Sequence, residues 1–341
     1  MFAKKNVVAA AALLAIAGAA QAQVKVYGTV DIGFGSFEAA HEAGSSDRTT
    51  KVNSGNMMTS FIGFAGSEDL GGGLKAEFAL ETFLNPDTGS TGPNMAGGFW
   101  GRGSNVALSG GFGKVALGQY DNPLFTSGYT YNPFGSSMTF SPTMRHFYYN
   151  QAGVAQSAAT TGFDTGFVNS ITYESPVIQG FGATVQFSPK ESGTSNSYAA
   201  SGSYNVGPAS ATLTYVKSGI ATAYDASEKV LGLGASYDFG VAKAFLQYTT
   251  IKQDSGTANK DTIYQVGASV PVTEKGTVLA SFGKLSNKLT SNGAKETDTV
   301  FSVGYDYALS KRTDVYVVFK NNQHTNVDSG QTTAVGIKHN F

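Results

Sequence analysis

The 341-residue chain contains no cysteine, and its four histidines are scattered along the sequence. The first absence excludes disulfides and cysteine-based zinc sites. Charged residues make up only 14%, whereas about 25% is usual in soluble domains. The formal net charge of −1 is not that of a nucleic-acid-binding domain, which carries a basic patch. We therefore expect no nucleic-acid partner, no metal site and no other cofactor.

Long apolar runs are also missing, except at the start of the chain. The run at residues 7–20 follows two lysines and precedes the small-residue tripeptide at 20–22. This order is typical of a secretory signal peptide, and the run is shorter than the roughly 20 residues that a membrane-spanning helix needs. We expect residues 1–22 to be a cleaved signal peptide. No shift in composition divides residues 23–341, which we expect to form one domain.

The rest of the chain alternates between apolar and polar residues. In residues 24–34, for example, the even positions are apolar or glycine, whereas the odd positions include Lys25, Tyr27 and Asp31. A period of two predicts β-strands with one apolar and one polar face. The same alternation returns in residues 74–81, 183–187, 231–239 and 264–270.

Short and long connections follow each other between these strands. Seven short, mostly glycine-containing turns are expected at residues 66–73, 109–113, 175–182, 205–209, 238–242, 271–276 and 308–313. Eight longer polar loops are expected at residues 36–56, 82–99, 121–166, 189–199, 218–228, 252–261, 285–297 and 321–331. Fifteen connections predict sixteen strands.

Two all-β architectures could use such strands. A soluble sandwich buries its apolar faces between two sheets, whereas a membrane barrel turns them outward to lipid. Strands near ten residues fit a tilted membrane span, and short turns alternating with long loops are typical of outer-membrane barrels. An even number of strands also lets an antiparallel sheet close without a free edge, which a bilayer requires. We predict a sixteen-stranded antiparallel transmembrane β-barrel.

Several blocks of sequence carry a family resemblance. They are Val26-Tyr27-Gly28 with Asp31, and residues 63–81, 169–176, 304–316 and 335–341. Together they resemble the trimeric general porins of Gram-negative outer membranes over the whole mature length. The resemblance implies a homotrimer without enzymatic activity, in which each barrel is a water-filled channel for ions and small hydrophilic solutes. It also implies contact with outer-membrane lipid and lipopolysaccharide, and recognition of the terminal Phe341 by the barrel-assembly machinery.

In such porins the third long loop folds inward and narrows the channel. The third and longest connection here is residues 121–166, and so long a loop is expected to be functional. Candidate residues for the channel wall and its narrow zone come from inward-facing strand positions and from this loop. They are Lys25, Tyr27, Asp31, Phe61, Lys75, Glu77, Glu81, Arg102, Lys114, Gln119, Tyr129, Tyr131 and Arg145.

The chain departs from the family in its basic residues. Many relatives carry arginine, lysine and arginine at the positions of Phe61, Ala65 and Gln119, and those cations favour anions. With them replaced, we expect a weakly ion-selective channel with less anion preference than a typical relative. The direction of the remaining Arg102 stays open, because it shares its alternation with the apolar Val106 and Leu108.

Three other functions remain open. The outer loops could make the barrel mainly a receptor or adhesin surface. Alternatively, Phe61 and the loop tyrosines could favour neutral or aromatic solutes. An outer-membrane hydrolase would need a catalytic set in fixed geometry. His146 beside Arg145, and His324 near Asp328, form no such set in the sequence.

Overall fold

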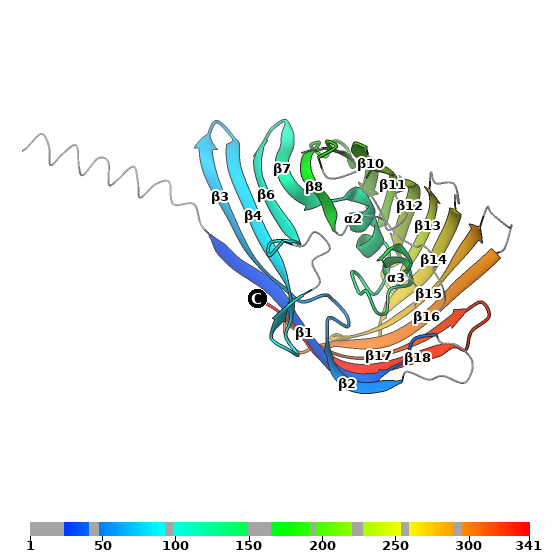
Figure 1. The fold of residues 1–341 in the computed structure, drawn as a ribbon. Helices are drawn as coiled ribbons and strands as arrows, with labels where there is room; N and C mark the ends of the chain where they lie inside the picture. The colour runs from blue at the N-terminus through cyan, green and yellow to red at the C-terminus, as the bar shows by residue number, and fades with distance from the viewer. Residues whose placement is uncertain are drawn as a thin grey trace, which may run out of the picture.

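The computed structural model describes residues 24–40, 48–92, 98–148, 165–191, 195–219, 228–253, 259–289 and 295–341, and it forms a barrel (Figure 1). The predicted signal peptide lies outside these residues. The strands are β1 (Lys25–Phe37), β2 (Thr49–Ser54), β3 (Phe61–Gly71), β4 (Leu74–Asn85), β5 (Ser90–Thr91), β6 (Gly103–Gly110), β7 (Gly113–Asp121), β8 (Gly166–Glu174), β9 (Phe181–Ser188), β10 (Ser197–Val206), β11 (Ala209–Ser218), β12 (Glu228–Asp238), β13 (Lys243–Gln253), β14 (Asn259–Pro271), β15 (Gly276–Leu289), β16 (Lys295–Ala308), β17 (Thr313–His324) and β18 (Gly330–Asn340).

The sheet closes on itself because the last strand pairs with the first. β18 runs antiparallel to β1 from Thr29 opposite Asn340 to Ser36 opposite Thr333. Every wall strand is antiparallel to the neighbouring wall strands in sequence. Closure leaves no unpaired sheet edge, which is the condition for a sheet to lie in hydrocarbon.

The 18 strands assigned in the described residues make up sixteen barrel strands, which is the predicted number. β3 pairs with the first part of β1 and β2 with the second part, so β2 and β3 are two pieces of one barrel strand. β5 is a two-residue pairing beside β4. The predicted loop 36–56 was therefore too long, because it contains β2. Alternation alone did not reveal a strand with only one apolar residue.

The two faces of the wall decide between barrel and sandwich. On the outer face Val26 is 54% exposed and Leu213 is 55% exposed, whereas the inward Asp31 and Gln247 are 0% and 2% exposed. A sandwich would bury the apolar residues and expose the polar ones. The reverse arrangement is the one that lipid requires, because a charged side chain on the outer face near mid-membrane costs about 2–4 kcal/mol.

The predicted short turns lie at one end of the barrel. The turn between β3 and β4 shows their chemistry, since Gly71, Gly72 and Gly73 have φ angles of 84°, 61° and 81°. Residues with a Cβ atom adopt this left-handed region rarely, so consecutive glycines allow a connection this short. The long loops leave the opposite end, which faces the cell exterior in outer-membrane barrels.

Residues 122–148, the larger described part of the connection between β7 and β8, lie inside the barrel. They contain two short helices, α2 (Pro123–Thr130) and α3 (Pro142–Tyr148), and Figure 1 shows both within the ring of strands. α2 packs on β10, β11 and β12, and α3 packs on β14, β15 and β16. Within the parts of the chain that the structure describes, no helix is long and apolar enough to cross a bilayer.

Candidate functional site

Residues 122–148, which include α2 and α3, are called the inward-folded segment below. Its first set of contacts with the wall is made by α2. Asn122 caps this helix by accepting a hydrogen bond from the Leu124 amide, and its side-chain amide donates to Gln186 Oε1 on β9 at 2.9 Å. Gln247 on β13 donates to the carbonyl oxygen of Gly128 at 3.0 Å. The buried amide side chains of the wall thus supply hydrogen-bond partners to Asn122 and to the Gly128 carbonyl, as buried polar groups require.

α3 has its own set of polar contacts. The Thr143 amide donates to Gln265 Oε1 on β14 at 2.9 Å. His146 Nε2 lies 2.9 Å from Asp298 Oδ1 on β16, and Asn322 donates to both oxygens of the same carboxylate. His146 is 0% exposed, so this is a buried structural contact rather than a group presented to solute.

Apolar residues fill the remaining space between this segment and the wall. One buried cluster joins Leu124 and Phe147 to inward residues of the strands, among them Val216, Val230 and Ile251. A second cluster joins Phe134 and Phe140 of the segment to wall residues such as Val318. Inward apolar side chains therefore occur where the segment covers them, which explains why the inner face is not uniformly polar.

Glycines give the segment room to approach. A Cβ atom at Gly234 would lie 2.3 Å from Tyr131 Cδ2, and one at Gly283 would lie 2.4 Å from Pro142 Cβ. Both distances are far below van der Waals contact. These glycines occupy inward positions of β12 and β15, so the wall is thinned at the places where the segment rests.

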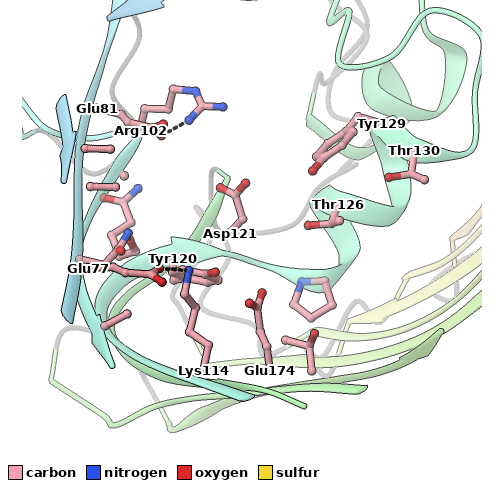
Figure 2. A pocket seen from close by; sticks show the side chains of 18 of the residues that line it. Glu77, Glu81, Arg102, Lys114, Tyr120, Asp121, Thr126, Tyr129, Thr130 and Glu174 are labelled. Atoms are coloured by element: carbon pink, nitrogen blue, oxygen red, sulfur yellow. Dashed lines mark hydrogen bonds and ion pairs between the residues drawn. The ribbon is translucent and has the colours of Figure 1, made fainter. Parts of the chain in front are cut away.

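The segment leaves a cavity of about 780 Å³ on its other side. Figure 2 shows α2 on one side of it, with wall strands opposite. Eight of the predicted channel residues line this space, namely Lys25, Glu77, Glu81, Arg102, Lys114, Gln119, Tyr129 and Tyr131. Hydroxyl groups dominate the helix side, through Thr126, Tyr129 and Thr130 (Figure 2).

Ion pairs join acidic and basic side chains along the wall of the cavity. Lys114 Nζ lies 2.5 Å from Glu77 Oε2, and Arg102 pairs with Glu81 (Figure 2). The Arg102 guanidinium also lies over the Phe61 ring, 4.1 Å from its centroid. Two of the three cations that line the cavity are thus matched by a carboxylate.

The direction of Arg102 is now explained. It precedes β6, whose pairing with β4 begins at Gly103 opposite Glu81. The regular ladder ends here: the Arg102 amide still donates to the Glu81 carbonyl, but the Gly101 carbonyl accepts from Gln119 and that of Arg102 accepts from Thr165. Strand alternation does not apply outside the strand, so Arg102 turns inward although Val106 and Leu108 point outward.

Two acidic residues of the cavity were absent from the predicted set. Asp121 ends β7 and Glu174 ends β8, and both line the cavity (Figure 2). Alternation could have identified Glu174, since its even position matches the inward Thr172. Asp121 follows a register shift between Gly118 and Tyr120, which alternation cannot reveal.

Five predicted residues do not line the cavity. Tyr27 donates to Glu81, and Phe61 lies beneath Arg102. Asp31 is fully buried and accepts hydrogen bonds from two backbone amides and from the Tyr316 hydroxyl. Lys75 is exposed beside the β3–β4 turn, and Arg145 lies on α3, close to Lys320 and Asp298.

The tyrosines of the inward-folded segment are neutral hydrogen-bonding groups. Burial raises the pKa of Tyr129 above its ordinary value, as it does for Tyr131, whose hydroxyl lies 2.9 Å from Ser210 Oγ. Both hydroxyls therefore remain protonated at neutral pH. Within the described residues, no group of three or more histidine, aspartate or glutamate side chains could hold a metal ion.

Comparison with known proteins agrees with this architecture. The model of the Gram-negative porin family matches residues 9–327. The chain belongs to the Gram-negative porin family. The porin is 34% identical to outer membrane porin protein 32 of Delftia acidovorans, with 92% of this chain and 88% of the relative covered. The family match and this outer-membrane relative confirm the predicted outer-membrane location.

Solved structures match the porin along most of its length. An anion-selective porin from Comamonas acidovorans has a TM-score of 0.74 at 27% identity, covering 94% of this chain and 100% of that one. The outer membrane protein OmpT of Vibrio cholerae in a trimer form has a TM-score of 0.70 at 14% identity, covering 94% and 99%. The second likeness concerns the fold alone.

Proposed function

We propose that this porin is a passive channel for ions and small hydrophilic solutes, narrowed by residues 121–166. The observation that supports this best is the cavity of about 780 Å³ between α2 and a largely polar wall inside a closed barrel. Such a channel performs no chemistry. It lowers the barrier for hydrophilic solutes by offering a hydrated path across an apolar slab.

We infer weak ion selectivity from the side chains around the cavity. Four carboxylates, Glu77, Glu81, Asp121 and Glu174, line it together with three cations, Lys25, Arg102 and Lys114. Charges of one sign in a narrow, low-dielectric channel concentrate ions of the other sign. With the two sets nearly balanced, the anion preference named for the Comamonas relative should be weak or lost here.

The partners follow from the family. Homotrimer formation is supported by family membership and by the trimer form of the similar Vibrio protein. We also propose that the chain is exported after cleavage of residues 1–22 and that the barrel-assembly machinery recognises Phe341. The assembled barrel contacts lipopolysaccharide. Phe341 already has a structural position, since its backbone pairs with that of Gly28.

Planar-bilayer recording tests the channel proposal. The purified porin should insert and give ohmic steps in groups of three, because each trimer carries three channels. Liposomes containing it should swell in small sugars and not in large ones. Insertion without conductance would overturn the proposal and favour the receptor or adhesin alternative.

A channel for neutral or aromatic solutes has less support. Phe61 is only 6% exposed and lies beneath Arg102, so it has little surface to offer a passing ring. The swelling assay distinguishes this alternative, since an aromatic solute should then enter faster than a sugar of equal size. A hydrolase is also disfavoured, because His146 is buried against Asp298 rather than placed in the cavity.

A further inference from the structure

Three polar side chains lie in a row on the inner face of the barrel, at the long-loop ends of β14, β15 and β16. Asp261 on β14 lies directly opposite Asn287 on β15, and Asn287 lies directly opposite Glu296 on β16. Asp261 and Asn287 share the alternation of the buried Ile263 and Leu285, so the row faces inward. Asp261, Asn287 and Glu296 are called the polar row below.

Two members of the polar row are buried without adequate partners. Asp261 and Asn287 are each 1% exposed. The Asn287 amide approaches the Asp261 carboxylate. Nevertheless, Asp261 Oδ1 and both polar atoms of Asn287 have no hydrogen-bond partner of normal geometry among the described residues. Burial of a polar group in this state is unfavourable, and burial of a carboxylate is more so.

The protein supplies no cation of its own to the row. Among the described residues, no ion pair joins a basic side chain to Asp261 or Glu296. The lysines that precede these two residues, Lys260 and Lys295, are exposed on the outer face of the wall. A cation that pairs with both carboxylates therefore has to come from solution.

The chemistry of the row selects the kind of cation. Side chains directly opposite each other in a sheet have Cβ atoms about 4.5–5.5 Å apart, so oxygens from three adjacent strands can converge on one ion. Carboxylate and amide oxygens suit hard cations, whereas copper and zinc sites use nitrogen or sulfur ligands. Ca²⁺ accepts six to eight oxygens in flexible geometry, but Mg²⁺ demands a near-ideal octahedron. Three ligands fixed by strand register favour the less demanding ion.

The position of the row suggests what a bound ion would do. Glu296 is only partly buried, which leaves the row a path for an ion. Helix α3 packs on β14, β15 and β16, the same three strands that the row joins. Asp298, which holds His146 of this helix, lies two residues beyond Glu296 on β16. An ion in the row would therefore tie together the strands on which α3 rests.

We propose that the polar row binds one Ca²⁺ ion through the carboxylates of Asp261 and Glu296 and the side-chain carbonyl oxygen of Asn287. Water molecules supply the remaining ligands, as is common for this ion. The row lies at the long-loop end, which faces the cell exterior in outer-membrane barrels. Extracellular sites bind Ca²⁺ with dissociation constants of about 10⁻⁴–10⁻³ M. The proposal concerns the wall beneath α3 and does not depend on conduction.

Calcium binding to the purified porin tests the proposal. The protein is freed of metal with a chelator and titrated calorimetrically with calcium chloride at pH 8 in neutral detergent. Its thermal midpoint is measured by near-ultraviolet circular dichroism in calcium, magnesium or potassium chloride at equal ionic strength, and in chelator. Asp261→Asn removes one ligand charge. The matched control is Glu274→Gln, which removes an exposed charge from the turn at the other end of β14 and β15.

The wild type and the control should bind one Ca²⁺ ion at the row, and calcium should raise their thermal midpoints more than magnesium or potassium does. Asp261→Asn should bind calcium at least about ten-fold more weakly, since even changes outside the ligand set cost that much. In chelator, Asp261→Asn should melt at or above the wild-type midpoint, because it removes a buried charge. This increase separates loss of a ligand from loss of folding.

Three results would overturn the proposal. Equal calcium affinity in the wild type and Asp261→Asn would place the ion elsewhere. Equal midpoints in the three chlorides would show screening of charge and no specific site. Absence of calcium binding would mean that the buried Asp261 is protonated instead. None of these measurements reads conductance, so this proposal and the channel proposal fail separately.

Discussion

Individual residues around the cavity show that counting basic residues is a poor guide to selectivity. Arg102 is an inward cation, but Glu81 pairs with it and the Phe61 ring lies beneath its guanidinium. A cation held in this way presents little net charge to a passing anion. The carboxylate beside it therefore matters for selectivity as much as the guanidinium does.

Neutralising Glu81 should expose the charge of Arg102. In Glu81→Gln the lining gains one net positive charge, while the amide can still accept the hydrogen bond from Tyr27. We expect reversal potentials in a salt gradient to shift toward anions by a few-fold in permeability ratio. Glu68→Gln, at the exposed end of β3 and outside the cavity lining, is the control, and an equal shift in both variants would contradict this explanation.

At the scale of elements, the inward-folded segment is held by shape as well as by hydrogen bonds. Gly283 lies where Pro142 of α3 approaches β15, and Gly234 lies where Tyr131 approaches β12. The buried His146–Asp298 contact then fixes α3 in this position. The segment should therefore respond to side chains added to the wall beneath it.

Gly283→Val should displace α3 from the wall. The new Cβ would lie 2.4 Å from Pro142 Cβ, and overpacking of this kind costs about 1–3 kcal/mol. We expect a lower thermal midpoint by near-ultraviolet circular dichroism and altered, noisier single-channel conductance. Gly202→Val is the control, because a Cβ there meets no atom within 4 Å. Wild-type conductance and melting in Gly283→Val would show that the segment does not depend on this gap.

At the scale of the whole molecule, alternation predicted the barrel because lipid penalises outward charges in the middle of every strand. The connection of residues 121–166 was predicted as the inward loop, and the position of its residues 122–148 is set by wall residues such as Gln247 and Gly283. Alternation marks such residues as inward but not as covered by a loop.

The summed charge of the cavity lining sets the ion preference of the whole channel. The cavity lining carries one more carboxylate than cations, so the porin should favour cations slightly at low salt. The preference should fade toward 1 M salt, where the Debye length falls from about 10 Å to about 3 Å. Reversal potentials measured across a potassium chloride gradient, at low and at high mean concentration, give both results. The double variant Asp121→Asn, Glu174→Gln reverses the charge balance and should turn the low-salt preference to anions. Strong anion preference in the wild type at low salt would contradict the prediction, since it would require cations that dominate this lining.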